Sequence, residues 1–233
     1  MSDVPTRSVP RAGARDPVAD RPRPTAAAAL HIGVRRVATA AEAAAVAGVL
    51  AAAAVAASPV AVLLGADHDA RRAALRRGLA VLAGWAIIHG AVDVHASGAG
   101  AAIWLPADLD AEDAIDDAVL EAGANTLATA ALGVSRRPSI AAATAAGPAA
   151  YLLAVGTVPG HRRRGVARQV LDAYHAGLDA AHAAGWAAAT DLAGHRLLTA
   201  AGYRPDHVDQ AAPGLALQWL RRLPGTGRDG AAW

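Results

Sequence analysis

A strand-like segment that runs into a helix through a basic turn decides the fold. It reads Tyr151-Leu-Leu-Ala-Val-Gly-Thr157, then Val158-Pro-Gly160, then His161-Arg-Arg-Arg-Gly-Val-Ala167. The first part has the composition and length of a buried β-strand, and Val158-Pro-Gly160 indicates a turn. Apolar residues then recur with helical spacing, which predicts a helix over 165–184.

The basic turn has the properties of an anion-binding site. The free N–H groups of the first helical turn and the positive end of the helix dipole point into such a turn. Gly165 and Ala167 leave the backbone uncovered, so that a pyrophosphate can approach it closely. The arginines add charge and bidentate hydrogen bonds. The alternative is that they form a surface cluster on an ordinary loop.

The spacing Pro159-x-x-Arg162-x-x-Gly165-x-Ala167 resembles the acyl-CoA-binding motif of the GNAT superfamily of N-acetyltransferases, of the type that acts on small molecules. The resemblance covers residues 31–222 and implies an α/β (α+β) fold. Its central sheet is expected to be mixed and mostly antiparallel, with helices on both faces. The sheet is also expected to splay between its fourth and fifth strands.

The order of the later elements is similar to that family. We expect a strand over Trp186–Asp191, a short helix from about Gly194, and the last strands after the Gly202-Tyr203 step. The GNAT domain is assigned to residues 30–222, between a disordered Pro- and Arg-rich tail over 1–29 and a flexible tail over 223–233.

Upstream of the motif, hydrophobic periodicity predicts further elements. Ala83–Val94 and Ala101–Leu105 are strand-like, and Ser97-Gly98 between them favours an antiparallel hairpin. His89, flanked by apolar residues, is expected in the core. The other expected elements are a strand over His31–Val37, helices over 40–57, Asp67–Leu82 and Asp108–Ala124, and an unassigned segment over 125–148. Solvated faces are expected for the acidic helix over Asp108–Ala124 and for Arg71, Arg72, Arg76 and Arg77.

The resemblance also implies which residues hold acetyl-CoA, the co-substrate. By position, the end of the strand would lie beside the pantetheine arm, and the turn would cradle the pyrophosphate through its backbone N–H groups. Those residues are Val155, Gly156 and Thr157 for the arm, and Arg162, Arg163, Arg164, Gly165, Val166 and Ala167 for the pyrophosphate. Trp104 would face the acceptor pocket, or would be a core tryptophan.

The family transfers an acyl group from the thioester to an amine in one ternary complex, with a base for the amine and an acid for the thiolate. The position of the family's acid tyrosine, counted back from Gly202-Tyr203, holds Leu198. Thr199 or His195 could serve instead, the thiolate could leave unassisted, or the protein no longer acetylates. The candidates for the base are Asp191, His95 and Asp93.

The resemblance of the turn motif to this family implies an acetyl-CoA-dependent N-acetyltransferase that acts on a small-molecule amine, in resistance or specialised metabolism. The alternatives are a GNAT-fold protein with another acyl donor or a non-acetylating reaction, and a non-catalytic acyl-CoA-binding module. The bias toward Ala, Arg, Gly and Pro is typical of a GC-rich, actinobacterial-like genome.

The composition excludes several classes of protein. The absence of cysteine excludes disulfides, zinc–thiolate sites and a cysteine nucleophile, and no metal is expected. A formal charge of only +2 disfavours a nucleic-acid binder. Charged residues interrupt every candidate signal peptide, and Pro59 interrupts the longest uncharged run, so a cytoplasmic protein without a membrane span is expected. A homodimer is compatible with the resemblance.

Overall fold

A computed structural model describes residues 33–57, 61, 64–65, 67–106, 147–212 and 215–225. The expected N-terminal tail, the acidic helix over Asp108–Ala124 and nearly all of the unassigned segment over 125–148 lie outside the described residues. The core of the structure is a seven-stranded sheet with the order β1-β2-β3-β4-β5-β7-β6. Only the β4–β5 pair is parallel, so the predicted mixed, mostly antiparallel sheet is confirmed.

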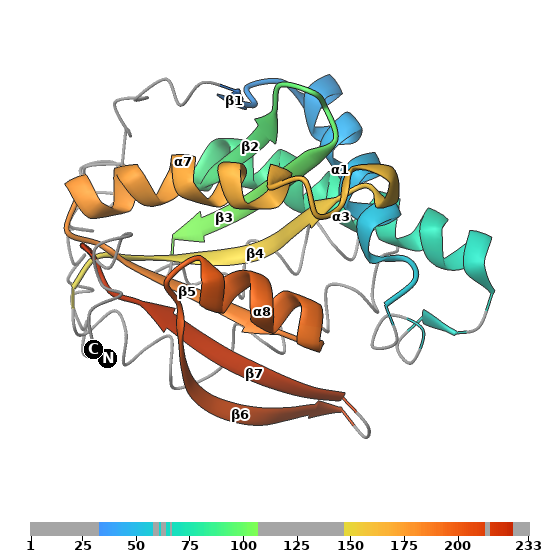
Figure 1. The fold of residues 1–233 in the computed structure, drawn as a ribbon. Coiled ribbons are helices and arrows are strands. Elements are labelled where there is room, and N and C mark those ends of the chain that lie inside the picture. Colours follow the sequence, from blue (N-terminus) through green and yellow to red (C-terminus); the bar gives the residue numbers. More distant parts are fainter. Residues whose placement is uncertain are drawn as a thin grey trace, which may run out of the picture.

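Helices cover both faces of this sheet (Figure 1). One face packs against α1 and α3, and the other against α7 and α8. The strands are β1 Val34–Arg36, β2 Ala91–His95, β3 Gly100–Pro106, β4 Ala149–Thr157, β5 Ala184–Ala189, β6 Arg204–Ala212 and β7 Leu215–Arg222. The helices are α1 Ala40–Ala54, α3 His68–His89, the short 3-10 turn η1 Pro159–His161, α7 Val166–Ala180 and α8 Leu192–Ala200. Among the described residues, no helix is long and apolar enough to cross a membrane.

The strand β3 shows how small and large side chains share the core. Successive strand residues point to opposite faces of a sheet. Ile103 therefore packs in the cluster under α1 and α3, whereas Ala102 and Trp104 pack in the cluster under α7. All three side chains are completely buried. The alanine-rich sequence thus forms two cores, each built around a few large residues.

The expected hairpin is present, but its first strand is much shorter than predicted. Ser97-Gly98 lies between β2 and β3, which pair antiparallel. Residues 83–89, however, form the last two turns of α3, not a strand. The aromatic and β-branched residues in this stretch favoured a strand, whereas the buried helical stripe that includes Leu75 and Leu82 continues through it at Ala83 and Ala86. His89 lies at the exposed end of that helix and is not a core residue.

Gly90 explains where α3 stops. A Cβ atom at this position would lie 2.1 Å from the carbonyl oxygen of Trp104. Only glycine allows the chain to pass so close to β3 as it turns into β2.

Two arginines that are distant in sequence hold the C-terminal end of α1. Arg71 is buried and donates to the carbonyl oxygen of Gly65 at 2.7 Å and, more weakly, to that of Val55 at 3.4 Å. The expected solvated position of Arg71 is therefore wrong, because the last carbonyls of a helix need donors from outside it. Arg162 donates to the carbonyl oxygen of Ala53 at 2.8 Å.

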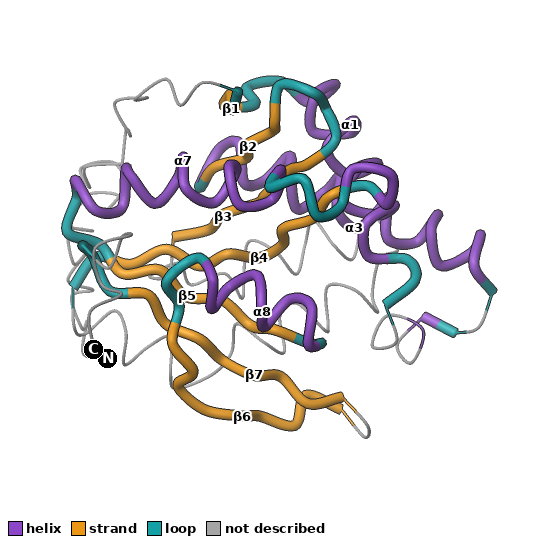
Figure 2. The backbone as a smooth tube through the Cα atoms, in the orientation of Figure 1, coloured by secondary structure: helices purple, strands orange, loops and turns teal. Residues whose placement is uncertain are grey.

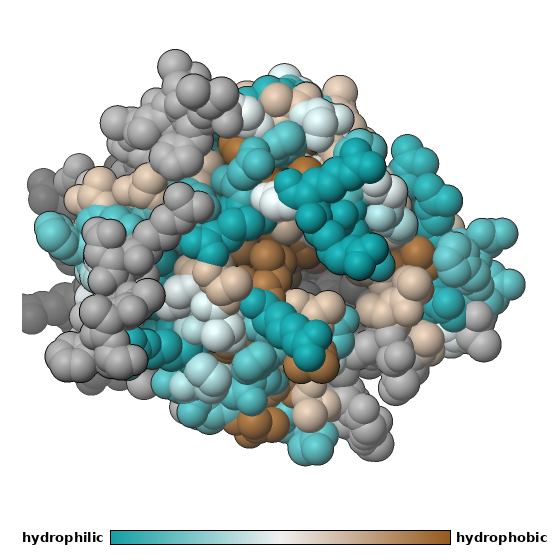
Figure 3. All heavy atoms as spheres, in the orientation of Figure 1, coloured by the Kyte–Doolittle hydropathy of each residue, from teal (hydrophilic) through white to brown (hydrophobic). Residues whose placement is uncertain are grey.

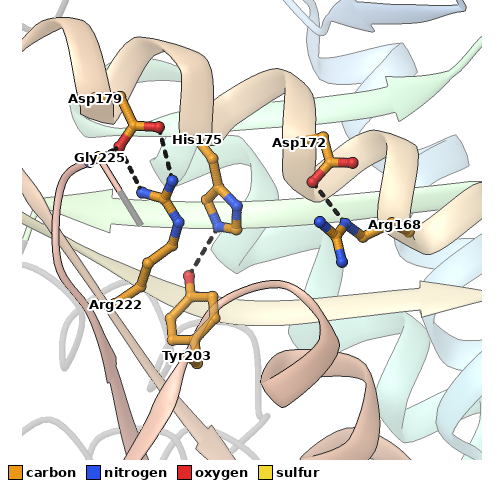
Figure 4. A network of polar contacts seen from close by, with 7 residues as sticks. All are labelled: Arg168, Asp172, His175, Asp179, Tyr203, Arg222 and Gly225. Atoms are coloured by element: carbon orange, nitrogen blue, oxygen red, sulfur yellow. Dashed lines mark hydrogen bonds and ion pairs between the residues drawn. The ribbon is translucent and has the colours of Figure 1, made fainter. Parts of the chain in front are cut away.

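A buried ion pair joins the end of β7 to α7 (Figure 4). Arg222 is almost completely buried and donates to both carboxylate oxygens of Asp179, at 2.8 and 2.7 Å. The backbone N–H of Gly225 also donates to Asp179, at 2.8 Å. Next to this pair, His175 and the Tyr203 hydroxyl are 3.1 Å apart. Burial is the main cause that lowers the pKa of His175, to about 3, so this imidazole is neutral.

We expect Asp179→Ala to lower the free energy of unfolding by about 3 kcal/mol, because it leaves the Arg222 guanidinium buried without a counter-charge. Asp172→Ala in the same helix is the control. It removes a partly exposed pair with Arg168 and should cost about 0.5 kcal/mol. Denaturant unfolding measures both. Equal losses would contradict a special role for the Arg222 pair.

The same pair predicts a pH dependence. Partial burial alone would raise the pKa of Asp179, but hydrogen bonds from Arg222 and Gly225 outweigh it and hold this pKa below its ordinary value. Its contribution is complete above the unfolded pKa of about 3.9 and is lost as the pH falls through the lower folded pKa. The stability difference between wild type and Asp179→Ala should therefore be constant near neutrality and shrink below about pH 4. A stability difference that grows on acidification would contradict a lowered pKa of Asp179.

Candidate functional site

The candidate site begins where β4 and β5 separate. The two strands pair in parallel only from Ala149↔Ala184 to Leu152↔Ala187. Beyond this point β4 continues to Thr157 with β3 as its partner, while β5 pairs with β7. Figure 2 shows the two strands side by side at one end and spread apart at the other. The predicted splay between the fourth and fifth strands is confirmed.

The turn after β4 lies at the open end of this splay. Because parallel strands end at the same edge of a sheet, the turn and the start of α8 flank the same opening. Figure 3 shows the surface hollowed between them, with apolar atoms lining part of the hollow. Residues 153–156 of β4 are half-buried there.

The backbone of the turn leaves the start of α7 uncapped. Gly165 is the N-cap residue, with φ +79, and no side chain caps the helix. Arg163 also has a positive φ, of 61. The first N–H groups of α7 therefore have no side-chain acceptor within the helix cap, and an anion in the turn would satisfy them. The predicted helix over 165–184 thus begins as expected, at Val166, and ends earlier, at Ala180.

One buried hydroxyl beside the turn also has no partner. Thr157 ends β4 and is buried, and its Oγ1 makes no hydrogen bond within the described structure. Gly100 lies against this hydroxyl, because a Cβ at Gly100 would be 3.4 Å from it. The same Cβ would meet the Val166 side chain at 2.4 Å. Such an orphaned hydroxyl, an unpaired strand edge and an uncapped helix start all fit a ligand with amide and phosphate groups.

The predicted arginines of the turn differ in their contacts. The Arg162 guanidinium reaches the end of α1 at Ala53, so its side chain is engaged with the protein. Arg163 and Arg164 are exposed, and no contact of their side chains is found among the described residues. Arg163 and Arg164 therefore keep side chains that are free to meet a ligand, whereas the backbone N–H of Arg162 already donates to the carbonyl oxygen of Pro159 at 3.3 Å.

Two of the catalytic candidates lie under α7 on β2. Asp93 is only 4% exposed and accepts a hydrogen bond from Arg36 at 2.7 Å. Burial raises the pKa of this carboxyl despite the opposing effect of Arg36. The ring of His95 lies between the Ser97 hydroxyl, at 2.7 Å, and the Gln169 amide oxygen, at 3.0 Å. β3 separates both residues from the opening beside β4.

The other candidates lie on or next to α8. Asp191 is exposed, follows β5 and caps α8 by accepting from the Gly194 N–H at 2.7 Å. Thr199 is exposed near the end of the helix, whereas Leu198 is 3% exposed and packs in the core with Tyr203. No described contact joins the two candidates on β2 to Asp191 or Thr199, so the four side chains do not form one cluster.

Trp104 is a core residue, which was one of its two predicted positions; the other was the acceptor pocket. Its indole is completely buried and stacks on Tyr174, with ring centroids 4.0 Å apart and planes 8° from parallel. Burial is also the main cause that raises the pKa of Tyr174 to about 12, so the phenol stays neutral. Among the described residues, no group of His, Asp or Glu side chains is arranged to hold a metal ion.

Sequence reasoning missed the tertiary contacts around this site. The contact of Arg162 with α1 spans 109 residues, and Gln169 reaches His95 across 74. No local pattern signals either contact. The close approach of Gly100 to α7 had only a weak signal, a glycine just after a turn.

Comparison with known proteins gives matches at the level of structure alone. No protein-family model and no curated protein matches the chain. A polyamine N-acetyltransferase of Drosophila melanogaster that forms N-acetylagmatine is 16% identical, with a TM-score of 0.54 over 82% of this chain and 98% of that one. A histone acetyltransferase or related acetyltransferase of Corynebacterium glutamicum is 20% identical, with a TM-score of 0.56 over 83% and 96% of the two chains.

A mosquito arylalkylamine N-acetyltransferase-like protein is 15% identical, with a TM-score of 0.56 over 82% of this chain and 99% of the other. At such sequence identities the similarity shows a shared fold, and it says nothing about the substrate or the mechanism. The splayed β4–β5 pair, the uncapped turn before α7 and these neighbours together show that the chain has the GNAT acetyltransferase fold.

Proposed function

We propose that the protein is an acetyl-CoA-dependent N-acetyltransferase that acts on a small-molecule amine. The observation that carries this proposal is the opening between β4 and β5 with the uncapped start of α7 at its edge. The polyamine N-acetyltransferase neighbour and the arylalkylamine N-acetyltransferase-like neighbour support a small amine as the acceptor.

The residues of this opening fit the two halves of the co-substrate. The free edge of β4 at Val155 and Gly156 would pair with the amides of the pantetheine arm, and the unpartnered Thr157 hydroxyl lies at its end. The N–H groups from Gly165 to Ala167 would bind the pyrophosphate. Acetyl-CoA supplies the activated acyl group. The protein lowers the barrier by holding amine and thioester in contact and by hydrogen bonding to the developing oxyanion.

Asp191 is the best placed of the candidate bases. It follows the diverging end of β5, at the edge of the opening, and its carboxylate is exposed. One carboxylate oxygen caps α8, which fixes the group without removing its charge. Asp93 and His95, by contrast, lie under α7 and are held by Arg36 and Gln169.

An acid for the thiolate is missing from the position of the family's tyrosine. Leu198 is buried in the core and cannot donate a proton. A thiol with a pKa of about 8.5 leaves as a thiolate without much help, so transfer remains feasible. The same leucine motivates the second candidate, a GNAT-fold protein that binds acyl-CoA but does not acetylate. Thiol release with a panel of amines separates the two candidates.

Binding of acetyl-CoA should depend on Gly165. Gly165→Val places a β-branched residue at a positive φ, next to the N–H groups that would hold the pyrophosphate. We expect its affinity for acetyl-CoA to fall by about tenfold or more in calorimetric titration. Gly160→Val is the control in the same turn, since its Cβ would meet nothing within 4 Å.

The outcomes of this titration are distinct. An unchanged affinity of Gly165→Val for acetyl-CoA would show that the co-substrate does not bind at this turn. A wild-type protein that fails to bind acetyl-CoA even at millimolar concentration would refute the proposed function itself.

Activity should depend on the charge of Asp191. Asn caps a helix as well as Asp does, so Asp191→Asn keeps α8 intact but removes the base. We expect the rate of thiol release to fall by about a hundredfold with little change in stability. Asp191→Ala should lose in addition about 1 kcal/mol of stability. A fully active Asp191→Asn enzyme would assign the base to another group.

A further inference from the structure

A second hollow lies between α1 and α3, on the face of the sheet opposite α7 and α8. Its volume is about 410 Å³. It is lined by Gly48 and Ala51 of α1 and by Asp69, Arg72, Ala73, Arg76 and Arg77 of α3. None of these residues belongs to the opening beside β4.

Three exposed arginines, Arg72, Arg76 and Arg77, contribute to the lining of this hollow. Arg72 and Arg76 are one helical turn apart, and like charges at this spacing repel each other. No hydrogen bond or ion pair of Arg72, Arg76 or Arg77 occurs among the described residues. Asp69 is the one carboxylate in the lining.

The facing helix supplies no second carboxylate. Glu42 is the only acidic residue within α1, and its side chain is already bound to Arg35 and to Thr39. Among the described residues, the lining of the hollow therefore keeps an excess of positive charge, with three arginines against one aspartate.

Gly48 keeps the hollow open. A Cβ atom at this position would meet nothing within 4 Å, so no close packing requires a glycine there. Glycine inside a helix costs about 1 kcal/mol relative to alanine. The other lining residues without charge, Ala51 and Ala73, are also small. A costly glycine beside three unpaired arginines indicates space reserved for something outside the chain.

We propose that this hollow binds a small polyanion, an organic molecule that carries phosphate or clustered carboxylate groups. The planar guanidinium group matches both phosphate and carboxylate with paired hydrogen bonds. The hollow has the size of a small-molecule site and three arginines are among its lining residues, whereas a nucleic acid needs a longer basic track. This site is independent of the proposed acetyl-CoA site.

Nitrogen-15 NMR titration with inorganic pyrophosphate and, separately, with citrate tests the proposal. Binding should shift the amide signals of Gly48 and Ala73 in a saturable way. The probe that shifts them more strongly identifies phosphate or carboxylate as the preferred group. Shifts confined to Gly160 and Gly165 would place the anion in the turn before α7, and would overturn the proposal without touching the proposed function.

Variants make the test specific. The combined Arg72→Gln, Arg76→Gln and Arg77→Gln variant changes only exposed side chains and should weaken binding by about tenfold or more. Gly48→Leu should block the hollow while leaving its charges in place. Arg204→Gln, which removes an exposed arginine of β6, should bind like the wild type. Weakening that follows only the number of charges removed, with an effect of Arg204→Gln and none of Gly48→Leu, would reduce the binding to unspecific attraction by net charge. Unchanged affinity in the triple variant would exclude the site.

Discussion

The parting of β4 and β5 is the constraint on which the candidate site depends. A strand within a sheet normally satisfies its backbone groups on both sides. Here β5 turns to pair with β7, and the second half of β4 keeps one partner, β3. The chain thereby brings together a free strand edge, the uncapped start of α7 and the buried, unpartnered hydroxyl of Thr157. The open site is a consequence of strand pairing before any catalytic side chain is considered.

The closed end of the splay is held by the buried ion pair. Arg222 pairs in register with Gly185, at the start of β5, and its side chain binds Asp179 near the end of α7. α7 also packs across β2, β3 and β4. The clamp therefore joins the two halves of the sheet where they meet and leaves them free to diverge at the other end (Figures 1 and 4).

Local patterns predicted the parts of this molecule that local chemistry determines. The turn at Gly165 and the hairpin turn at Gly98 use positive φ values that few residues other than glycine adopt, and both turns are present. The last turns of α3 were misread because Ile87 and Ile88 favour strands, while a helical stripe that starts far upstream decides their structure.

The face that a side chain occupies was not predictable in the same way. Asp93 and Trp104 lie on strands covered by helices on both sides, and their sequence neighbours do not tell which face is open. The arginine hollow was likewise invisible, since the pattern of Arg72 and Arg76 is also that of a solvated helix face. The position of these side chains thus depends on packing between segments that are far apart in the chain.

The bond from Arg162 to Ala53 has an evolutionary consequence. The GNAT motif that this turn resembles has Arg or Gln at the position of Arg162, and here the long arginine side chain reaches from the turn to the end of α1. In relatives whose first helix ends a turn earlier, that carbonyl would be absent and selection for arginine would relax. The identity of residue 162 and the length of α1 should therefore covary, and this covariation would reflect how the helix is anchored, independently of how strongly the cofactor is bound.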